Sequence, residues 1–145
     1  MITFRSATLS DFEWTYLVKK KALGDYVVAT WGAWYEDLQK SFFSQTFREG
    51  DYQVIEYEHI PVGTIWVDRR PDELFLAELY LLPAYQNKGI GSQIICDLKA
   101  EARQRQIPFR LTVLQINHSA RRFYERHGLT CTEELTNHYV MTYHG

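Results

Sequence analysis

The fold of this chain is decided by one stretch of sequence, which reads Leu79-Tyr80-Leu81-Leu82-Pro83-Ala84-Tyr85-Gln86-Asn87-Lys88-Gly89-Ile90-Gly91-Ser92. The apolar run 74–82, interrupted by Glu78, predicts a strand, and Pro83 ends it because proline has no N–H for a sheet ladder. An apolar stripe at helical spacing predicts a helix from Gly89 to about Gln106. The stretch is therefore a strand, a short turn and a helix start with glycines.

Glycines at the start of a helix allow a phosphate group to bind there. First-turn N–H groups have no intrahelical partner, and glycines let a phosphate approach them. In the alternative interpretation the glycines only shape the turn. Two nucleotide motifs fit poorly, since Gly-x-Gly-x-x-Gly needs glycine where Ile94 stands, and a P-loop lysine follows its glycines whereas Lys88 precedes them.

A second block, whose Asn117 lies 26 residues after Gly91, reads Val113-Leu114-Gln115-Ile116-Asn117-His118-Ser119-Ala120-Arg121-Arg122-Phe123-Tyr124-Glu125-Arg126-His127-Gly128-Leu129. The first block has the spacing Gln-x-x-Gly-x-Gly after Leu-Tyr-x-x-Pro and resembles the acetyl-CoA-binding loop of the GNAT superfamily of N-acetyltransferases. The second resembles the strand–Asn–helix block of that superfamily, with Asn117, Ala120, Tyr124 and Gly128 at matching positions.

The resemblance implies a fold and a cosubstrate site. The fold is a single α/β (α+β) domain over 1–145, with a mixed, mostly antiparallel sheet, helices on both faces, and strands 74–82 and 109–114 splayed apart. Acetyl-CoA is the implied cosubstrate. Its pantetheine would bond to the backbone of Leu79, Tyr80 and Leu81, and Asn117 would contact it further along. Its pyrophosphate would lie on the N–H groups of Asn87, Lys88, Gly89, Ile90, Gly91 and Ser92.

Two residues are candidates for catalysis. Glu78 interrupts an apolar strand at a position that often faces the acceptor cleft in the family, so it is the candidate base; the alternative is a solvent-facing or salt-bridged glutamate. Some relatives carry a glutamate on the next strand, where this chain has Thr112, which leaves Glu78 or ordered water. Tyr124 is the candidate acid for the leaving thiolate, and the alternative is a packing residue.

Aromatic residues make up 15% of the chain and crowd its first third. Most are expected to form core, because aromatic stripes at helical spacing usually do. The resemblance places this region over the acceptor site, and Trp31 is the nominated substrate-wall residue.

The remaining pattern predicts these elements: strands 2–5, 52–57, 62–67, 109–114, 129–134 and 139–143, and helices 12–23, 35–47 and 119–127. Gly24 is expected to weaken or end the first helix, Gly50 to close the second, and Ser119 to cap the last. A turn is expected at His59-Ile60-Pro61.

Charge and composition argue against several classes of binding partner. With 16 Lys+Arg against 18 Asp+Glu, the net charge of −2 argues against nucleic acid as a partner. No apolar window suits a membrane span, the first residues, 1–5, lack the apolar stretch of a signal peptide, and the histidines show no metal spacing. Cys96 and Cys131 are expected to be buried thiols in a reducing cytoplasm.

We therefore expect a cytoplasmic N-acetyltransferase that moves an acetyl group from acetyl-CoA to a primary amine by direct attack in a ternary complex, without a metal. We expect the acceptor to be a small-molecule or peptide amine. The sequence is also compatible with a homodimer. The alternative is a non-catalytic acyl-CoA-binding module that senses or regulates, because the two cofactor blocks support both interpretations equally.

Overall fold

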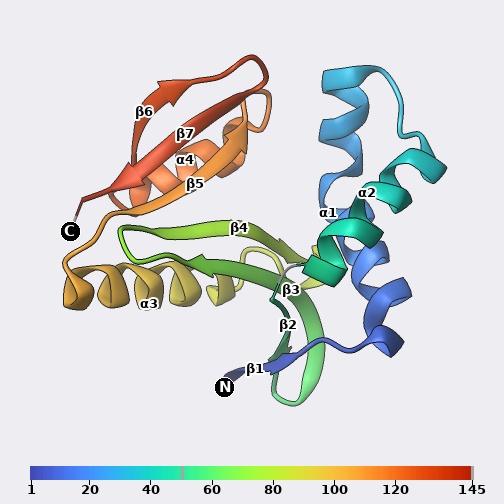
Figure 1. Ribbon diagram of the computed structural model, residues 1–145, viewed down its shortest axis with the longest axis horizontal. Coiled ribbons are helices and arrows are strands. Elements are labelled where there is room, and N and C mark those ends of the chain that lie inside the picture. Colours follow the sequence, from blue (N-terminus) through green and yellow to red (C-terminus); the bar gives the residue numbers. More distant parts are fainter. Residues whose placement is uncertain (50, 145) are drawn as a thin grey trace. The chain divides into compact units, whose positions relative to one another are not determined.

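The structure is a computed structural model that describes residues 1–49 and 51–144, with the side chains of residues 48 and 49 left aside (Figure 1). Gly50, expected to close the second helix, lies outside the described residues. The strands are β1 (Ile2–Ser6), β2 (Tyr52–Tyr57), β3 (Ile60–Arg69), β4 (Leu74–Leu81), β5 (Phe109–Leu114), β6 (Thr130–Glu134) and β7 (His138–Tyr143). The α-helices are α1 (Phe12–Trp31), α2 (Glu36–Glu49), α3 (Ile90–Arg105) and α4 (His118–Arg126), and short 3₁₀ turns lie at Leu9–Asp11 and Pro83–Tyr85.

The seven strands form one sheet in the order β1-β2-β3-β4-β5-β7-β6. The pairs β1–β2, β2–β3, β5–β7 and β6–β7 are antiparallel, and β4–β5 is parallel. These pairings confirm the predicted α/β class with a mixed, mostly antiparallel sheet. The contacts of the chain divide into two compact units: unit 1 comprises 1–66 and 78–86, and unit 2 comprises 67–77 and 87–144.

In unit 1, the hairpin between β2 and β3 turns one residue earlier than the sequence predicts. Glu58 and His59 both have positive φ, 50° and 69°, and Ile60 already pairs with Tyr57 in the ladder. The prediction of a turn at His59-Ile60-Pro61 is therefore wrong in position. A two-residue turn with both φ values positive matches the right-handed twist of the strands it joins.

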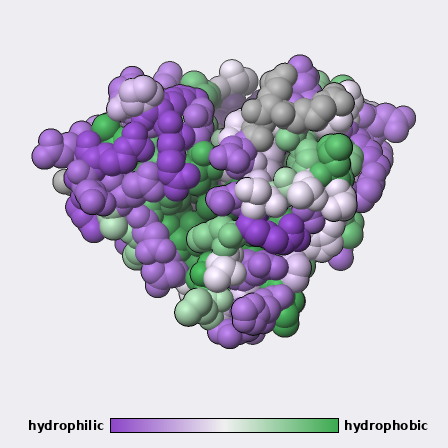
Figure 2. Space-filling view, turned by 60° about the horizontal axis from the view of Figure 1, so that its bottom comes forward, coloured by the Kyte–Doolittle hydropathy of each residue, from purple (hydrophilic) through white to green (hydrophobic). Residues whose placement is uncertain are grey.

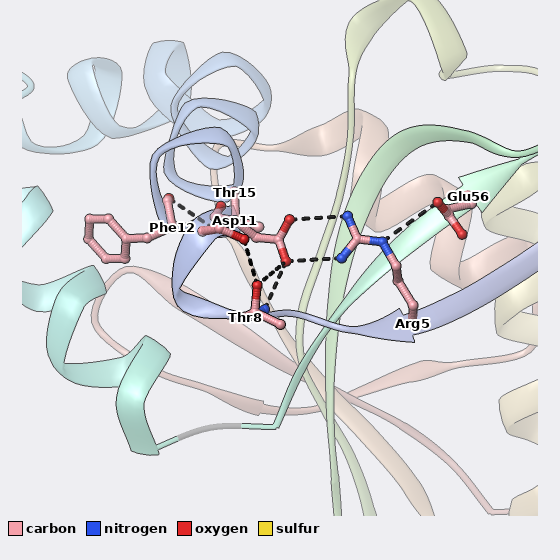
Figure 3. Close-up of polar contacts among 7 residues, drawn as sticks. Arg5, Thr8, Asp11, Phe12, Thr15 and Glu56 are labelled. Carbon is pink, nitrogen blue, oxygen red and sulfur yellow. Dashed lines mark hydrogen bonds and ion pairs between the residues drawn. The ribbon is translucent and has the colours of Figure 1, made fainter.

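The start of α1 is fixed to β1 by a charged network (Figure 3). Arg5 donates two hydrogen bonds to the Asp11 carboxylate, at 2.9 and 3.1 Å, and lies 3.6 Å from Glu56 on β2. The Thr8 N–H donates to the same carboxylate at 2.8 Å. The hydroxyl of Thr15, a fully buried residue, donates to the Asp11 carbonyl at 2.9 Å. The network fixes where the strand ends and the helix begins.

Helix α1 continues through Gly24 to Trp31, so the predicted end near Gly24 is wrong. A glycine inside a helix costs about 1 kcal/mol relative to alanine, which tertiary packing readily offsets. Buried Val27 lies beyond the glycine, on the continuation of the helix. The helix ends at Gly32, whose φ of 93° is the left-handed conformation typical of a helix C-terminus.

An aromatic cluster forms the core between α1, α2 and β2 in unit 1. Its buried members are Tyr16, Phe43, Phe47 and Tyr52, and Phe12, Trp34 and Trp66 pack against it. The Phe43 and Tyr52 rings lie 5.5 Å apart in an edge-to-face arrangement, which favours the ring quadrupoles. Five aromatics of the first third, Phe12, Tyr16, Trp34, Phe43 and Phe47, thus belong to the core or pack against it, whereas others from that third lie at the surface.

Unit 2 holds α3, α4 and the strands β5, β7 and β6. The predicted apolar stripe of α3 is confirmed, because Ile94, Ile95, Leu98 and Ala102 are all buried. The parallel register of β4 and β5 runs from Leu74 opposite Phe109 to Leu76 opposite Leu111. The divergence of these two strands beyond this point stays a prediction.

Helix α4 begins one residue earlier than predicted because Asn117, rather than Ser119, caps it. The Asn117 Oδ1 accepts a hydrogen bond from the Ala120 N–H at 3.1 Å. A side-chain oxygen in this position satisfies one of the first N–H groups of the helix, which otherwise lack a partner.

Candidate active site

Glu78 lies on β4, the fourth strand of the sheet, and its side chain is only 12% exposed. Three donors from three elements of unit 1 reach its carboxyl group. The Tyr52 hydroxyl of β2 donates to Oε2, the Lys19 ammonium of α1 lies 3.2 Å from Oε1, and the Tyr80 hydroxyl donates to Oε1 at 3.4 Å. The predicted base is thus a buried, ion-paired carboxyl group, so it shows features of both interpretations of the sequence.

The electrostatic surroundings act on Glu78 in opposite directions. Burial raises the pKa of the Glu78 carboxyl and is the largest effect, while the Lys19 charge and the hydrogen bonds from Lys19 and Tyr80 lower it. The net pKa lies above the usual value. A carboxyl group with a raised pKa retains a proton more readily, which suits a group that accepts one during a reaction.

The donors are positioned by the aromatic cluster. The Tyr52 ring packs against Phe43, Phe47 and Trp66, with centroids 5.4 to 5.6 Å apart. The Lys19 ammonium lies 5.4 Å from the centroid of the Phe43 ring. Sequence reasoning missed both Lys19 and Tyr52, because nothing local marks residues that meet Glu78 only through the fold.

Some backbone carbonyl groups of β4 after Glu78 already contact other residues. A Cβ added at Gly63 on β3 would collide with the Tyr80 carbonyl oxygen, so that carbonyl is directed at β3. The Leu81 carbonyl accepts a hydrogen bond from the Gln86 side chain at 3.0 Å. Two of the three predicted pantetheine contacts, Tyr80 and Leu81, therefore have carbonyl groups with close neighbours in the fold, and all three contacts stay predictions.

The turn between β4 and α3 presents unpaired amides. Asn87 and Gly89 adopt the left-handed conformation, with φ of 60° and 84°, and residues of this kind build anion-binding concavities. Among the described residues, no group accepts a hydrogen bond from the N–H groups of residues 87–92. A Cβ at Gly89 would meet nothing within 4 Å, so the turn has room for a ligand. These residues fit a diphosphate.

Ser92 connects this turn to α4 within unit 2. Its hydroxyl lies 3.1 Å from Nε2 of His127, the residue that follows α4. Burial, assisted by the charges of Lys99 and Arg126, lowers the pKa of His127. Nothing in the local sequence marks this contact, because Ser92 and His127 lie 35 residues apart in the chain.

Tyr124 lies on α4, one turn before His127, and is half-buried. Burial raises its pKa to about 12, so the phenol keeps its proton at any ordinary pH. Its ring packs edge-on against Phe123 at 5.3 Å. Its hydroxyl has no partner within the part of the chain that the structure describes. A neutral, unbonded hydroxyl is available to donate to a ligand.

Apolar side chains come to the surface near the end of α1 and along α2. Trp31 is 50% exposed, and Tyr35, Leu38 and Phe42 are also exposed. Figure 2 shows that hydrophobic residues reach the surface among hydrophilic ones on the face it presents. The exposure of Trp31 agrees with its nomination as a residue of the substrate wall, a role that stays a prediction.

Both cysteines are free and exposed, so the expectation of buried thiols is wrong. Cys96 lies on the polar face of α3, 3.9 Å from Nδ1 of His127, and Cys131 lies on β6, whose residues are all exposed. No group of three or more His, Cys, Asp or Glu suited to a metal is found in residues 1–49 and 51–144. None of the helices described there is long and apolar enough to cross a membrane.

The predicted site residues thus fall into two groups. Trp31 and the β4 residues Glu78 to Leu81 belong to unit 1, whereas the turn 87–92, Asn117 and Tyr124 belong to unit 2. Within unit 2, the Ser92–His127 contact joins the amide-rich turn to the helix that carries Tyr124.

Solved structures with the same fold include two named as N-acetyltransferases and one complex with a bisubstrate analogue. PaiA N-acetyltransferase from Thermoplasma acidophilum, in complex with coenzyme A, aligns with a TM-score of 0.77 at 18% identity over 100% of this chain and 99% of that chain. Arabidopsis thaliana Naa50, in complex with the bisubstrate analogue CoA-Ac-MVNAL, aligns with a TM-score of 0.67 at 16% identity over 98% and 97%. The Escherichia coli ribosomal-protein-S18-alanine N-acetyltransferase aligns with a TM-score of 0.65 at 19% identity over 98% and 91%.

These structural similarities are distant and show the fold alone. Comparison at the level of sequence identifies the family. A search of curated proteins finds no significant match. The profile of the acetyltransferase (GNAT) family, however, matches residues 10–129, which include both sequence blocks and Glu78. This chain belongs to the GNAT family of acetyltransferases.

Proposed function

We propose that this acetyltransferase moves the acetyl group of acetyl-CoA to a primary amine by direct attack in a ternary complex, with Glu78 as general base and Tyr124 as donor to the leaving sulfur. The observation that carries the proposal is the buried Glu78 carboxyl group, which lies directly before the strand end that leads into the amide-rich turn. The whole chain is the catalytic domain, since β3 and β4 each contribute residues to both units.

The amides of residues 87–92 bind the diphosphate. A hydrogen bond to a charged group contributes about 1.5–3 kcal/mol, whereas the dipole of a helix contributes about 0.3–1 kcal/mol. Several amides together therefore dominate binding, and a net charge of −2 on the chain does not prevent it. Asn117 uses its Oδ1 to cap α4, which leaves its Nδ2 to contact the cosubstrate.

Glu78 removes a proton from the acceptor. An amine attacks only in its neutral form, and a lysine-like amine with a pKa of about 10.4 costs about 4.6 kcal/mol to neutralise at pH 7. An α-amine with a pKa near 8 costs only about 1.4 kcal/mol. A partly desolvated carboxyl group that accepts the proton in the transition state lowers either cost.

Tyr124 donates a hydrogen bond to the sulfur as the carbon–sulfur bond breaks. Acetyl-CoA supplies an activated thioester whose leaving group is a thiolate. Complete proton transfer from a phenol with a pKa of about 12 to a thiol with a pKa of about 8.5 would cost about 4.8 kcal/mol. Stabilisation by a hydrogen bond, without complete transfer, is therefore the role that the pKa of Tyr124 favours.

The acceptor is a small-molecule or peptide amine. Two proteins of the same fold are named for peptide or protein amines, the Naa50 complex with CoA-Ac-MVNAL and the S18-alanine N-acetyltransferase. The exposed Trp31 would supply an apolar wall beside the acceptor. Two exposed free thiols favour a reducing compartment, and we place the protein in the cytoplasm.

The test is the release of coenzyme A thiol from acetyl-CoA in the presence of peptides, amino acids, polyamines and aminoglycosides. We expect at least one primary amine to be acetylated, with the product identified by a 42 Da mass increase. If no acceptor reacts while coenzyme A still raises the melting temperature, the chain is instead a non-catalytic acyl-CoA-binding module.

A further inference from the structure

Lys19 is the one charged side chain in contact with the Glu78 carboxyl group among the described residues. Its side chain is 15% exposed, and its ammonium lies 3.2 Å from Oε1. Lys20 and Lys40 of the same unit form ion pairs with Glu36 and Glu13, but their side chains are 43% and 41% exposed. Lys19 therefore differs from its neighbours in being covered.

Burying a lysine is unfavourable in itself. Fixing its side chain costs conformational entropy, and removing its charge from water costs more. A buried ion pair often adds little to stability compared with apolar residues of similar size. The Lys19–Glu78 pair is thus poorly explained by stability alone, which points to a role in the site.

Within residues 1–49 and 51–144, the groups that face the Glu78 carboxyl are Lys19 from α1, Tyr52 from β2 and Tyr80 from β4. The two tyrosines are neutral donors, so Lys19 alone supplies a full positive charge. A nearby ammonium favours the ionised form of a carboxyl group, while burial favours the neutral form. Only the ionised form can accept a proton.

We propose that Lys19 is a positioning residue for acetyl transfer: its ammonium group holds the Glu78 carboxyl in place and in the ionised form that accepts a proton from the acceptor amine. The inference rests on the proposed role of Glu78 as base. In the step, one N–H bond of the acceptor breaks and one O–H bond forms at Glu78. Lys19 keeps its own proton throughout, so no further reactant is needed.

The direct test is a titration of Glu78 by nuclear magnetic resonance. The protein is labelled with ¹³C at the Glu side-chain carboxyl, and the Glu78 signal is identified by its loss in Glu78→Gln. We expect Lys19→Met and Lys19→Gln to raise the titration midpoint of Glu78 by about one pH unit or more. Lys19→Arg keeps a positive charge and should leave the midpoint close to that of the wild type.

Kinetics provide the second measurement. In Lys19→Met and Lys19→Gln, the acid limb of kcat/KM should move to higher pH by the same amount, with the rate recovering on the alkaline side. Lys21→Met is the matched control, because Lys21 lies two residues away on α1, is exposed, and has no partner among the described residues.

An unchanged Glu78 midpoint in either folded neutral variant would overturn the inference, as would an equal loss of kcat/KM at every pH. Circular dichroism establishes which variants are folded, and one folded neutral variant is enough for the decision. The titration needs no acetyl-CoA, so it decides the coupling of Lys19 to Glu78 even if the acetyl-transfer assay refutes the proposed function.

Discussion

Two carboxyl groups in unit 1, Asp11 and Glu78, have similar partners and opposite electrostatic behaviour. Each contacts one cation and at least one hydroxyl, and their side chains are 14% and 12% exposed. Yet the Arg5 hydrogen bonds lower the pKa of Asp11 to about 2, whereas burial raises the pKa of Glu78. The same kinds of donor therefore give one structural and one reactive carboxyl group.

The two carboxyl groups differ in pKa because the surroundings of Glu78 are more deeply buried than those of Asp11. Asp11 lies in the turn between β1 and α1, and its cation, Arg5, is 42% exposed and forms a two-pronged contact. Glu78 lies on a middle strand of the sheet, and its cation, Lys19, is 15% exposed. Where little water remains, the cost of keeping a charge exceeds the gain from a single ammonium group. The following predictions test this contrast.

The largest expected effect is on catalysis at Glu78. Glu78→Gln keeps the shape and removes the base, so kcat/KM should fall by about 100-fold or more. The fall is measured with the best amine at pH 7.5, and the dissociation constant of coenzyme A should change little. Asp11→Asn is the control, with unchanged kcat/KM; equal losses in both variants would mean that the two carboxyl groups do not differ in function.

A smaller kinetic effect is expected at Tyr124. Tyr124→Phe removes the only hydroxyl that we assign to the leaving sulfur, so kcat should fall about tenfold or more. The affinity for coenzyme A, measured by calorimetry, should be nearly unchanged. Because the pKa of Tyr124 is about 12, the wild type should show no alkaline limb from this residue below about pH 11. A wild-type rate in Tyr124→Phe would remove Tyr124 from the mechanism.

A substitution at Gly89 tests the turn of residues 87–92, which we propose binds the diphosphate with backbone amides rather than with side chains. Gly89→Ala forces alanine into the left-handed conformation, which costs about 1–2 kcal/mol, so coenzyme A should bind roughly 5- to 30-fold more weakly. Gly32→Ala is matched to it, with φ of 93° and equally open space, in the cap of α1. It should lower the melting temperature without affecting affinity; similar affinity losses in both would show that strain anywhere disturbs the site.

The last effect concerns stability at Asp11, where no change in activity is expected. Its pKa falls from 3.8 unfolded to about 2 folded, a difference of about 2 kcal/mol. Because the folded pKa is the lower one, this stability is present above about pH 4 and lost as the pH falls toward 2. Urea unfolding at pH 7 should show Asp11→Asn less stable than the wild type, with the difference closing near pH 2. A difference independent of pH would contradict the Arg5–Asp11 assignment.

Local features of the molecule could be predicted from the sequence, whereas contacts made through the fold could not. Strands 52–57 and 109–114 lie where the pattern places them, and the glycine-rich turn was identified because its chemistry lies within six consecutive residues. Lys19 and Tyr52 precede Glu78 by 59 and 26 residues and reach it only through the fold, from α1 and from β2, which β3 separates from β4 in the sheet. The continuation of α1 past Gly24 was missed for a similar reason, since the packing that offsets the cost of glycine comes from other elements.

The central claim is that the buried Glu78 carboxyl accepts the proton of the acceptor amine. Its most direct test is the pH dependence of kcat/KM for acetyl transfer in the wild type and in Glu78→Gln, from pH 4.5 to 9.5. The account predicts an acid limb in the wild type, centred above the ordinary glutamate value, that is absent from a uniformly slow Glu78→Gln. The same acid limb and a similar rate in both proteins would contradict it.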